Sequence, residues 1–233
     1  MARSAFNRGP SRAKPNKKWI SLTNQAYREL EEMIVTLRLE PSTVLSETAL
    51  AERLEIGRTP IREALQRLAR EGLVVILPRK GILVSEINPK KQLLLLEVRR
   101  EIERLLARTG ALRRSEQERQ QFIKIADGME KAARENDDIG FMRYDHALNS
   151  LIAVAGRNEY ADRAIGLIHG LSRRFWYVHY KEAADMPLAA RLHANLARRI
   201  SDGDSVGAAE ACDRLIDYVE TFTRATVGID RQT

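Results

Sequence analysis

The spacing of the apolar residues changes once near the N-terminus, and this change limits the fold more than any other feature of the sequence. From Ser21 the apolar residues recur at spacings of three and four, as on one face of a helix that ends near Arg38. After Gly72 the pattern becomes that of two short strands, residues 73–76 and 82–84. The chain is therefore expected to begin with helical structure and then form a small β-hairpin.

Two further short helices are predicted between the first helix and the hairpin. Ser46 is a good N-cap for one of them, with Glu47 at the positive end of the helix dipole. Pro60 lies at the start of the next, where a proline costs no hydrogen bond, and this helix is expected to stop at Gly72, a residue suited to a left-handed C-terminal cap. Three helices and a hairpin with a basic tip at residues 79–81 describe a winged helix-turn-helix, which we expect to span residues 19–86.

The rest of the chain has a uniformly helical pattern. Residues 91–229 contain one proline, Pro187, and no strand-like run. Their apolar spacing predicts six helices in an antiparallel bundle, with the bounds 91–113, 115–135, 138–155, 159–180, 186–201 and 204–227. Residues 87–90 form the linker, so we expect a mainly α protein of two domains.

The positive charge is concentrated at the N-terminal end. The sequence has 39 Lys and Arg against 32 Asp and Glu, a formal net charge of +7, and seven of the positive residues precede the first acidic one, Glu29. Residues 1–18 are almost without apolar side chains, so we expect a disordered basic arm there, either a solubilising tail or a loose phosphate-binding extension. Residues 19–86 have nine basic and ten acidic residues. Binding of nucleic acid by that domain must therefore depend on where the basic side chains lie.

The third helix has apolar side chains on one face and basic side chains on another. Its apolar stripe consists of Ile61, Ala64, Leu65 and Leu68. Arg58 and Arg62 are four residues apart and project from the other side, at the end of a recognition helix that meets base edges in the major groove. Arginine there can bind O6 and N7 of guanine, and Thr59 can contact a phosphate or a thymine methyl. Taken alone, the arginine pair also fits an ordinary solvated helix.

The surrounding pattern resembles the N-terminal domain of the GntR superfamily of bacterial transcription regulators. The resemblance is carried by residues 45–47, 50–51, 57–65, 68, 71–73 and 78–81. It implies DNA contacts by Arg38, Arg58, Thr59, Arg62, Lys80 and Gly81. Ser42 and Gly57 depart from the family pattern, which commonly has glycine and serine at these two places.

The helical half resembles the FadR-like branch of this superfamily, whose second domain is the FCD ligand-binding domain. Six helices rather than seven imply its VanR-type variant. Many FCD domains hold a divalent metal through one aspartate and three histidines, and the resemblance places these at Asp145, Asn149, His193 and Leu215. Since Leu215 cannot ligate, we expect either zinc or a similar metal on Asp145, Asn149 and His193, or buried polar groups that bond to one another.

The resemblance also aligns Arg99 and Glu103 with an Arg and Glu pattern of the family. Four residues apart on one helix, they can form an intrahelical ion pair of small stabilising value. Alternatively, Arg99 reaches into the pocket and holds an organic acid, which the fork of a guanidinium suits. Together with Asp145, Asn149 and His193 it makes up the expected effector site.

Several function classes are excluded by the sequence. It contains no nucleophile motif, phosphate loop or metal-protease pair, so we do not expect an enzyme. It has no apolar run long enough to span a membrane and no signal peptide, so we expect a cytoplasmic protein. We predict a homodimeric repressor that binds a palindromic double-stranded operator and is released by a small organic acid. The alternative is a constitutive DNA-binding protein whose helical domain only dimerises.

Overall fold

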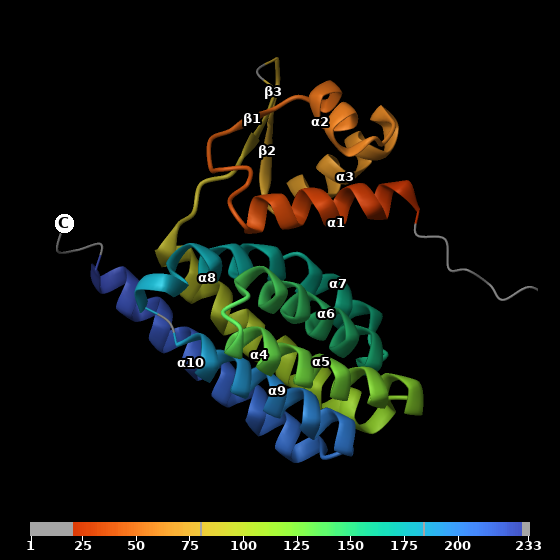
Figure 1. Cartoon of the computed structure of the whole chain (residues 1–233), viewed down its shortest axis with the longest axis vertical. Coiled ribbons are helices and arrows are strands. Elements are labelled where there is room, and N and C mark those ends of the chain that lie inside the picture. Colours follow the sequence, from red (N-terminus) through yellow and green to blue (C-terminus); the bar gives the residue numbers. More distant parts are fainter. Residues whose placement is uncertain (1–20, 80, 184, 230–233) are drawn as a thin grey trace, which may run out of the picture.

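The computed structural model describes residues 21–79, 81–183 and 185–229, which form a small domain with a β-sheet and a larger helical domain (Figure 1). The small domain contains α1 (Leu22–Val35), β1 (Val44–Leu45), α2 (Glu47–Leu54), α3 (Arg58–Arg70), β2 (Val74–Leu77) and β3 (Gly81–Val84). This order confirms the predicted winged helix-turn-helix. The expected arm, residues 1–18, and Lys80 lie outside the described residues.

Side-chain caps determine where α1 and α2 begin. The hydroxyl of Ser21 accepts a hydrogen bond from the backbone N–H of Asn24, and that of Ser46 accepts one from Ala49. Each bond satisfies an N–H group that has no partner inside the first turn of the helix. The cap at Ser46 is the one that the sequence predicts.

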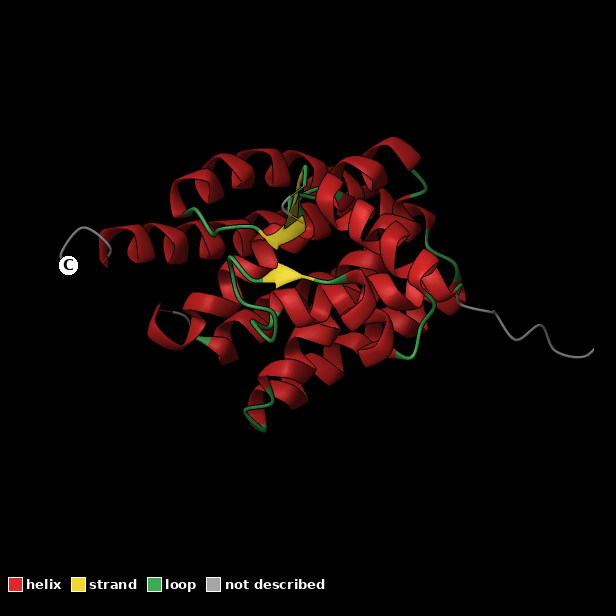
Figure 2. Ribbon diagram, turned by 90° about the horizontal axis from the view of Figure 1, so that it is seen from above, coloured by secondary structure: helices red, strands yellow, loops and turns green. Residues whose placement is uncertain are grey.

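The wing is a three-stranded antiparallel sheet in the order β1-β3-β2. β2 and β3 pair from Val74 opposite Val84 to Leu77 opposite Gly81. β1 adds only two residues to the other edge of β3, too few to show an alternating pattern, so the sequence does not predict it. In the view from above, the strands lie over the middle of the helical domain (Figure 2).

Among the described residues of the small domain, six backbone positions have a positive φ, and two of them fall on residues that the sequence analysis singles out. Gly72 follows α3 with φ 73°, in agreement with the predicted C-terminal cap. Ser42 has φ 64°, so a serine occupies a conformation that glycine adopts without steric cost. This explains why glycine is the common residue of the family pattern at this place.

The helical domain contains seven helices within the described residues. They are α4 (Pro89–Arg113), α5 (Glu116–Arg134), α6 (Asp138–Gly156), α7 (Glu159–Gly166), α8 (His169–Ala183), α9 (Met186–Asp202) and α10 (Ser205–Ile229). Their apolar faces form one continuous core, which includes Phe122, Phe141, Phe175 and Leu215. None of the helices described has the length and apolar character needed to cross a membrane.

The prediction of a single helix over residues 159–180 is wrong, because the helix is interrupted between α7 and α8. The N–H groups of Leu167 and Ile168 donate to carbonyls only three residues back, which tightens the backbone and ends the α-helical pattern. Gly166 and Gly170, which favour helix poorly, stand on either side. The expected count of six helices, from which the VanR-type variant was inferred, is therefore corrected to seven.

The two domains pack together through α1 and α8. Gly170 is buried at this contact, and a Cβ atom there would lie 2.8 Å from the side chain of Leu73. Val35 of α1 belongs to the core of the helical domain, and Leu171 of α8 packs against that of the small domain. Side chains of each domain therefore contribute to the packing of the other.

Candidate functional site

The N-terminal end of α3 is exposed and positively polarised. Gly57 caps the helix without a side-chain hydrogen bond, and the first turn contains no acidic residue. The unpaired N–H groups of this turn and the helix dipole favour an anion such as a phosphate. Arg58 and Thr59 lie exposed at this end.

Arg62, one turn further along α3, is held by α2. Its Nη2 atom lies 2.8 Å from Oε2 of Glu47, and its Nε atom lies 3.1 Å from both carboxylate oxygens. The hydrogen bond from Arg62 lowers the pKa of Glu47, so the carboxylate stays ionised. The pair fixes the direction in which the guanidinium leaves the helix.

A groove runs between α3 and the wing and brings two predicted DNA-contact residues together. It is lined by Glu47, Arg62 and Gln66 on the helical side and by Arg79 and Gly81 on the wing. Arg79 and Gly81 have φ values of 62° and 98°, which turn the chain at the tip of the hairpin. The groove thus presents basic side chains from two separate elements.

Arg38 is not part of this groove and lies just after the end of α1. Its Nη2 atom lies 2.6 Å from Oε1 of Glu32, and its Nε donates to the hydroxyl of Thr36 over 3.3 Å. Glu32 also accepts two hydrogen bonds of 2.9 Å from Arg143 of α6. The predicted DNA contact at Arg38 is therefore linked through one carboxylate to the helical domain.

A small pocket lies inside the helical domain, between α4, α6, α8, α9 and α10. Its volume is about 30 Å³, and its lining comprises Arg99, Phe141, Met142, Asp145, Asn149, His169, Ser172, Arg173, Trp176, His193 and Val219. All four residues predicted for the effector site are among them. A cavity of this size holds one or two water molecules, so an organic ligand requires side chains to move.

Asp145 is the centre of the polar groups in this pocket. Its Oδ1 atom accepts a hydrogen bond of 3.1 Å from Nδ2 of Asn149 and lies 3.3 Å from Nε2 of His193. Its Oδ2 atom lies 2.9 Å from Nε of Arg173. Burial by itself would raise the pKa of Asp145, but His193 and the charge of Arg173 outweigh it and hold that pKa well below its usual range.

This donor set does not fit a divalent metal. The amide nitrogen of Asn149 points at Oδ1 of Asp145 and donates to it, and the place of the family's remaining histidine is taken by Leu215, which is buried and apolar. Arg173 already places a positive charge 2.9 Å from Oδ2 of the same carboxylate, and this charge opposes a second cation beside Asp145. Across the described parts of the chain, no group of three or more His, Cys, Asp or Glu could hold a metal.

Arg99 forms an ion pair and also lines the pocket, so both predicted roles apply to the same side chain. Its Nε and Nη2 atoms lie 2.6 and 3.2 Å from the carboxylate of Glu103, and its Nη1 donates to Ser172. Nε2 of His169 lies 2.9 Å from Glu103. Burial would raise the pKa of Glu103, but the charge of Arg99 and the bond from His169 lower it to about 2.

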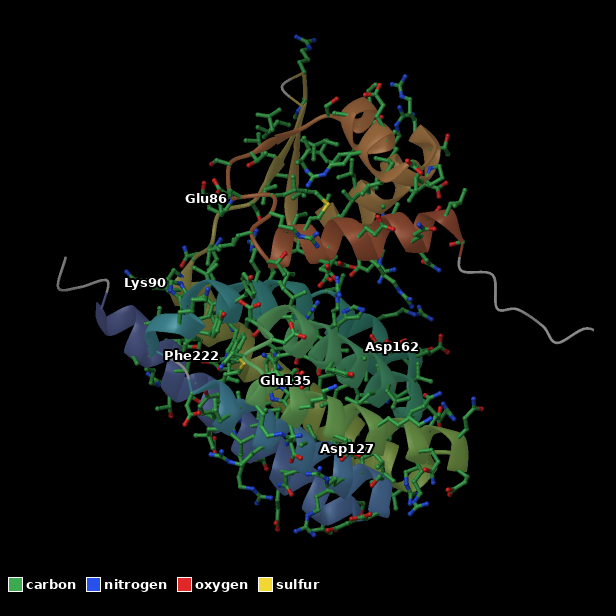
Figure 3. The ribbon with its side chains drawn as sticks, viewed as in Figure 1. Glu86, Lys90, Asp127, Glu135, Asp162 and Phe222 are labelled. Carbon is green, nitrogen blue, oxygen red and sulfur yellow. The ribbon has the colours of Figure 1, made fainter. Side chains whose placement is uncertain are left out.

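The sequence does not predict the role of Arg173, the most connected side chain of the pocket. It is 8% exposed and bridges Asp145 to Glu31 of α1. The next residue, Arg174, donates from Nη1 to the carbonyl of Ser85 over 2.9 Å, just before the segment between the domains that Glu86 and Lys90 mark in Figure 3. The only local feature of the sequence that could have pointed to this role is a pair of adjacent arginines in a segment rich in aromatic residues.

Comparison with known proteins gives two family matches. Residues 22–84 match the model of bacterial regulatory proteins of the gntR family, and residues 94–218 match that of the FCD domain. A transcriptional regulator from an unstable DNA locus of Streptomyces ambofaciens is 29% identical over 196 residues, 76% of this chain and 82% of that protein. The repressor RspR of Escherichia coli K12 is 26% identical over 187 residues, 79% and 82% of the two chains.

Solved structures share the fold. Escherichia coli McbR/YncC superimposes with a TM-score of 0.74 at 17% identity, over 90% of this chain and 100% of that one. A GntR regulator from Rhodococcus gives a TM-score of 0.61 at 21% identity, over 90% and 99%. The likeness covers both domains.

Proposed function

This chain belongs to the gntR family of bacterial regulatory proteins and is a DNA-binding transcriptional regulator with an FCD domain, not an enzyme, and from that premise we propose that it is a repressor. Acting in the cytoplasm, two copies bind a palindromic operator, and a small organic acid in the pocket of the helical domain releases them. The observation that carries the proposal is the exposed N-terminal end of α3 beside the wing groove.

The DNA contacts divide between bases and phosphates. Arg58 and Arg62 project from the end of α3 that enters a major groove, so they read guanines. Thr59 contributes to phosphate binding together with the first turn of the helix. Arg38 and the wing residues Lys80 and Gly81 contact the DNA backbone and fix the register of the protein on it.

A row of exposed apolar side chains on α4 supports the homodimer. Leu94, Val98 and Leu112 are 63%, 51% and 66% exposed, and Leu105 lies half-buried among them. Because their spacings are four and seven residues, these side chains share one face of the helix. Such a face is unfavourable in water unless another surface covers it, and the occupant that we infer is a second copy of the chain.

The charges beside this row suit an antiparallel pair of α4 helices. Glu101 lies four residues before Leu105, and Arg108 lies three residues after it. When two copies cross at Leu105, Glu101 of one copy faces Arg108 of the other, and Val98 faces Leu112. The same patch then contacts itself, as a twofold axis requires. Such an axis also matches the symmetry of a palindromic operator.

The effector is an organic acid held by Arg99, whose guanidinium fits a carboxylate, with Asp145, Asn149 and His193 as neighbours. Since the pocket holds only about 30 Å³, the acid binds an arrangement different from the one described. That difference in affinity between two arrangements is what allows a ligand to shift the protein away from DNA. A zinc or similar ion on Asp145, Asn149 and His193 has no part in this proposal, because the donor set opposes it.

The small pocket favours one alternative, a constitutive DNA-binding protein whose helical domain only dimerises. Arg99 and Arg173 both contact carboxylates inside the protein, so a ligand must displace an existing partner. The two functions differ in one observable, because only a sensing domain gains thermal stability from a ligand.

The experiment has two steps. Full-length protein first selects DNA from a random pool, and the selected duplex is then titrated with protein in the presence and absence of a panel of mono- and dicarboxylic acids. We expect at least one acid to raise the melting temperature and to weaken operator binding by about tenfold or more. Operator binding that no acid alters, with unchanged melting temperatures, would instead establish the constitutive function.

A further inference from the structure

We propose that the guanidinium of Arg173 supplies the positive charge beside Asp145 that the family resemblance gives to a metal ion, and that it joins the effector pocket to the DNA-binding domain through Glu31. The proposal rests on the assigned function, because it describes how the pocket communicates with the domain that reads DNA. It makes Arg173 a positioning residue for α1.

The guanidinium of Arg173 is a permanent positive charge that contacts two buried carboxylates. Its Nε atom lies 2.9 Å from Oδ2 of Asp145, its Nη1 atom contacts Glu31, and its Nη2 donates to the carbonyl of Met142 over 2.8 Å. Nδ1 of His146 lies 3.2 Å from Nη1. Two carboxylates thus share one guanidinium on a side chain that is almost entirely buried. A second cation beside Asp145 would be repelled by Arg173.

The same side chain separates two cavities. One is the effector pocket, and the other, of about 110 Å³, lies between the domains. Arg173 lines both of them, and the second cavity also reaches Glu31 of α1 and Arg67 of α3. Asn149 and His169 also line both cavities, but of these three shared residues only Arg173 bonds to Glu31 of α1.

An acid held by Arg99 also meets Arg173, which lines the same pocket, and there it must compete with the carboxylates already bound to that guanidinium. If it displaces Glu31, α1 loses its buried ionic contact with α8. If it displaces Asp145, the guanidinium is drawn away from the pocket wall. Either exchange changes how α1 is held, and thermodynamic reciprocity requires that DNA binding in turn alter the pocket.

The next residue of α1 provides a matched control. Glu32 also pairs across the domain boundary, with Arg143 of α6, through two hydrogen bonds of 2.9 Å. The Arg143 side chain is 65% exposed, so water screens the pair and it has no connection to the pocket. Glu31→Gln and Glu32→Gln thus remove one negative charge each from neighbouring positions, of which only the first contacts Arg173. Because Glu32 also holds Arg38, a proposed DNA contact, each variant is compared at an operator concentration that saturates it.

The coupling is tested by amide hydrogen exchange with the selected operator duplex as the only ligand. In the wild type and in Glu32→Gln, we expect operator binding to change exchange in residues 142–149 and 169–177 by about fivefold or more. In Glu31→Gln the change in these segments disappears while protection of α3 by DNA persists. The proposal is overturned if Glu31→Gln transmits the change as fully as Glu32→Gln does.

A separate experiment tests whether Arg173 takes the role of a metal ion. It uses titration calorimetry with zinc alone, so its result does not depend on whether an operator can be selected. Asn149→His restores a second histidine beside Asp145, and we expect it to bind zinc weakly because Arg173 remains. Combined with Arg173→Gln, the same change should bind zinc about 100-fold more tightly, with thermal melts to verify folding. Equal zinc affinity of the single and double variants would show that the charge of Arg173 does not replace that of a metal.

Discussion

The Nη2 atom of Arg62 on α3 lies 2.8 Å from Oε2 of Glu47 on α2. The arginine that we propose reads DNA is thus oriented by the preceding helix before any DNA is present. Because the Arg62 side chain is 55% exposed, the pair contributes little to the stability of the fold. Its effect is on binding, since a guanidinium already held in one direction loses less freedom when it docks on a base.

Glu47→Gln should therefore weaken sequence discrimination without unfolding the protein. Removal of the carboxylate frees Arg62 and takes a negative charge away from the DNA surface. We expect non-specific affinity to rise and the ratio of operator to scrambled-duplex affinity to fall about threefold to tenfold. Fluorescence anisotropy with both duplexes measures this ratio. Glu52→Gln, which changes an exposed glutamate elsewhere on α2, should leave this ratio unchanged; an effect equal to that of Glu47→Gln would refute the orienting role.

Val98→Glu should convert the proposed dimer to monomers, because it places a charge in the exposed apolar row of α4. Light scattering after size exclusion gives the mass, and we expect operator affinity to fall about 100-fold because one half-site alone is then bound. Val206→Glu is the control, since Val206 is 67% exposed on α10, outside this row. A dimer that survives Val98→Glu but not Val206→Glu would move the interface to α10.

Deletion of residues 1–18 should flatten the salt dependence of DNA binding. The segment contains six positive residues and no acidic one, and each phosphate contact that it makes contributes about 0.9 to the slope of log affinity against log salt. The preferred operator should stay the same, because phosphate contacts do not distinguish bases. A changed preference in DNA selection would mean that the arm reads bases.

Glu103→Gln should lower the free energy of unfolding by about 3–5 kcal/mol at neutral pH, because it leaves Arg99 buried without its carboxylate. The pKa of Glu103 is lowered to about 2 in the folded protein, below its ordinary value, so the ion pair stabilises the fold above about pH 4 and this contribution is lost toward pH 2. Urea unfolding of wild type and variant should thus differ most at pH 7 and progressively less at lower pH.

The control for this prediction is Glu210→Gln. Glu210 and Arg214 have the same spacing of four residues on α10, but their side chains are 63% and 49% exposed. We expect this change to alter stability by about 0.5 kcal/mol or less. Equal losses in the two variants would contradict the importance of burial.

The winged helix-turn-helix was predictable because its signals are local. The cap at Ser46, the glycine at Gly72 and the change of apolar period each act within a few residues, and the structure confirms all three. β1 and the break between α7 and α8 were not predictable in this way. β1 has too few residues for a pattern, and Leu167 and Ile168 are apolar residues in a segment that otherwise has a helical period.

The pocket likewise combines a contact that follows from local sequence with contacts that do not. Asp145 and Asn149 are one turn apart on α6, so their proximity follows from helix geometry. Arg173 is separated by 28 residues from Asp145 and by 142 from Glu31, and no local spacing connects such distant positions. Only the packing of α8 against α6 and α1 brings the three together, which is why a charged residue that opposes a metal escaped prediction.

The central claim is that specificity depends on arginines at the end of α3, and Arg62→Ala tests it most directly. The measurement is the affinity ratio between the selected operator and a scrambled duplex at fixed salt, compared with Arg70→Ala, an exposed arginine at the far end of the same helix. We predict that Arg62→Ala folds normally and loses about tenfold or more of this ratio, with little change in salt slope, while Arg70→Ala keeps it. An unchanged ratio in Arg62→Ala would contradict the account.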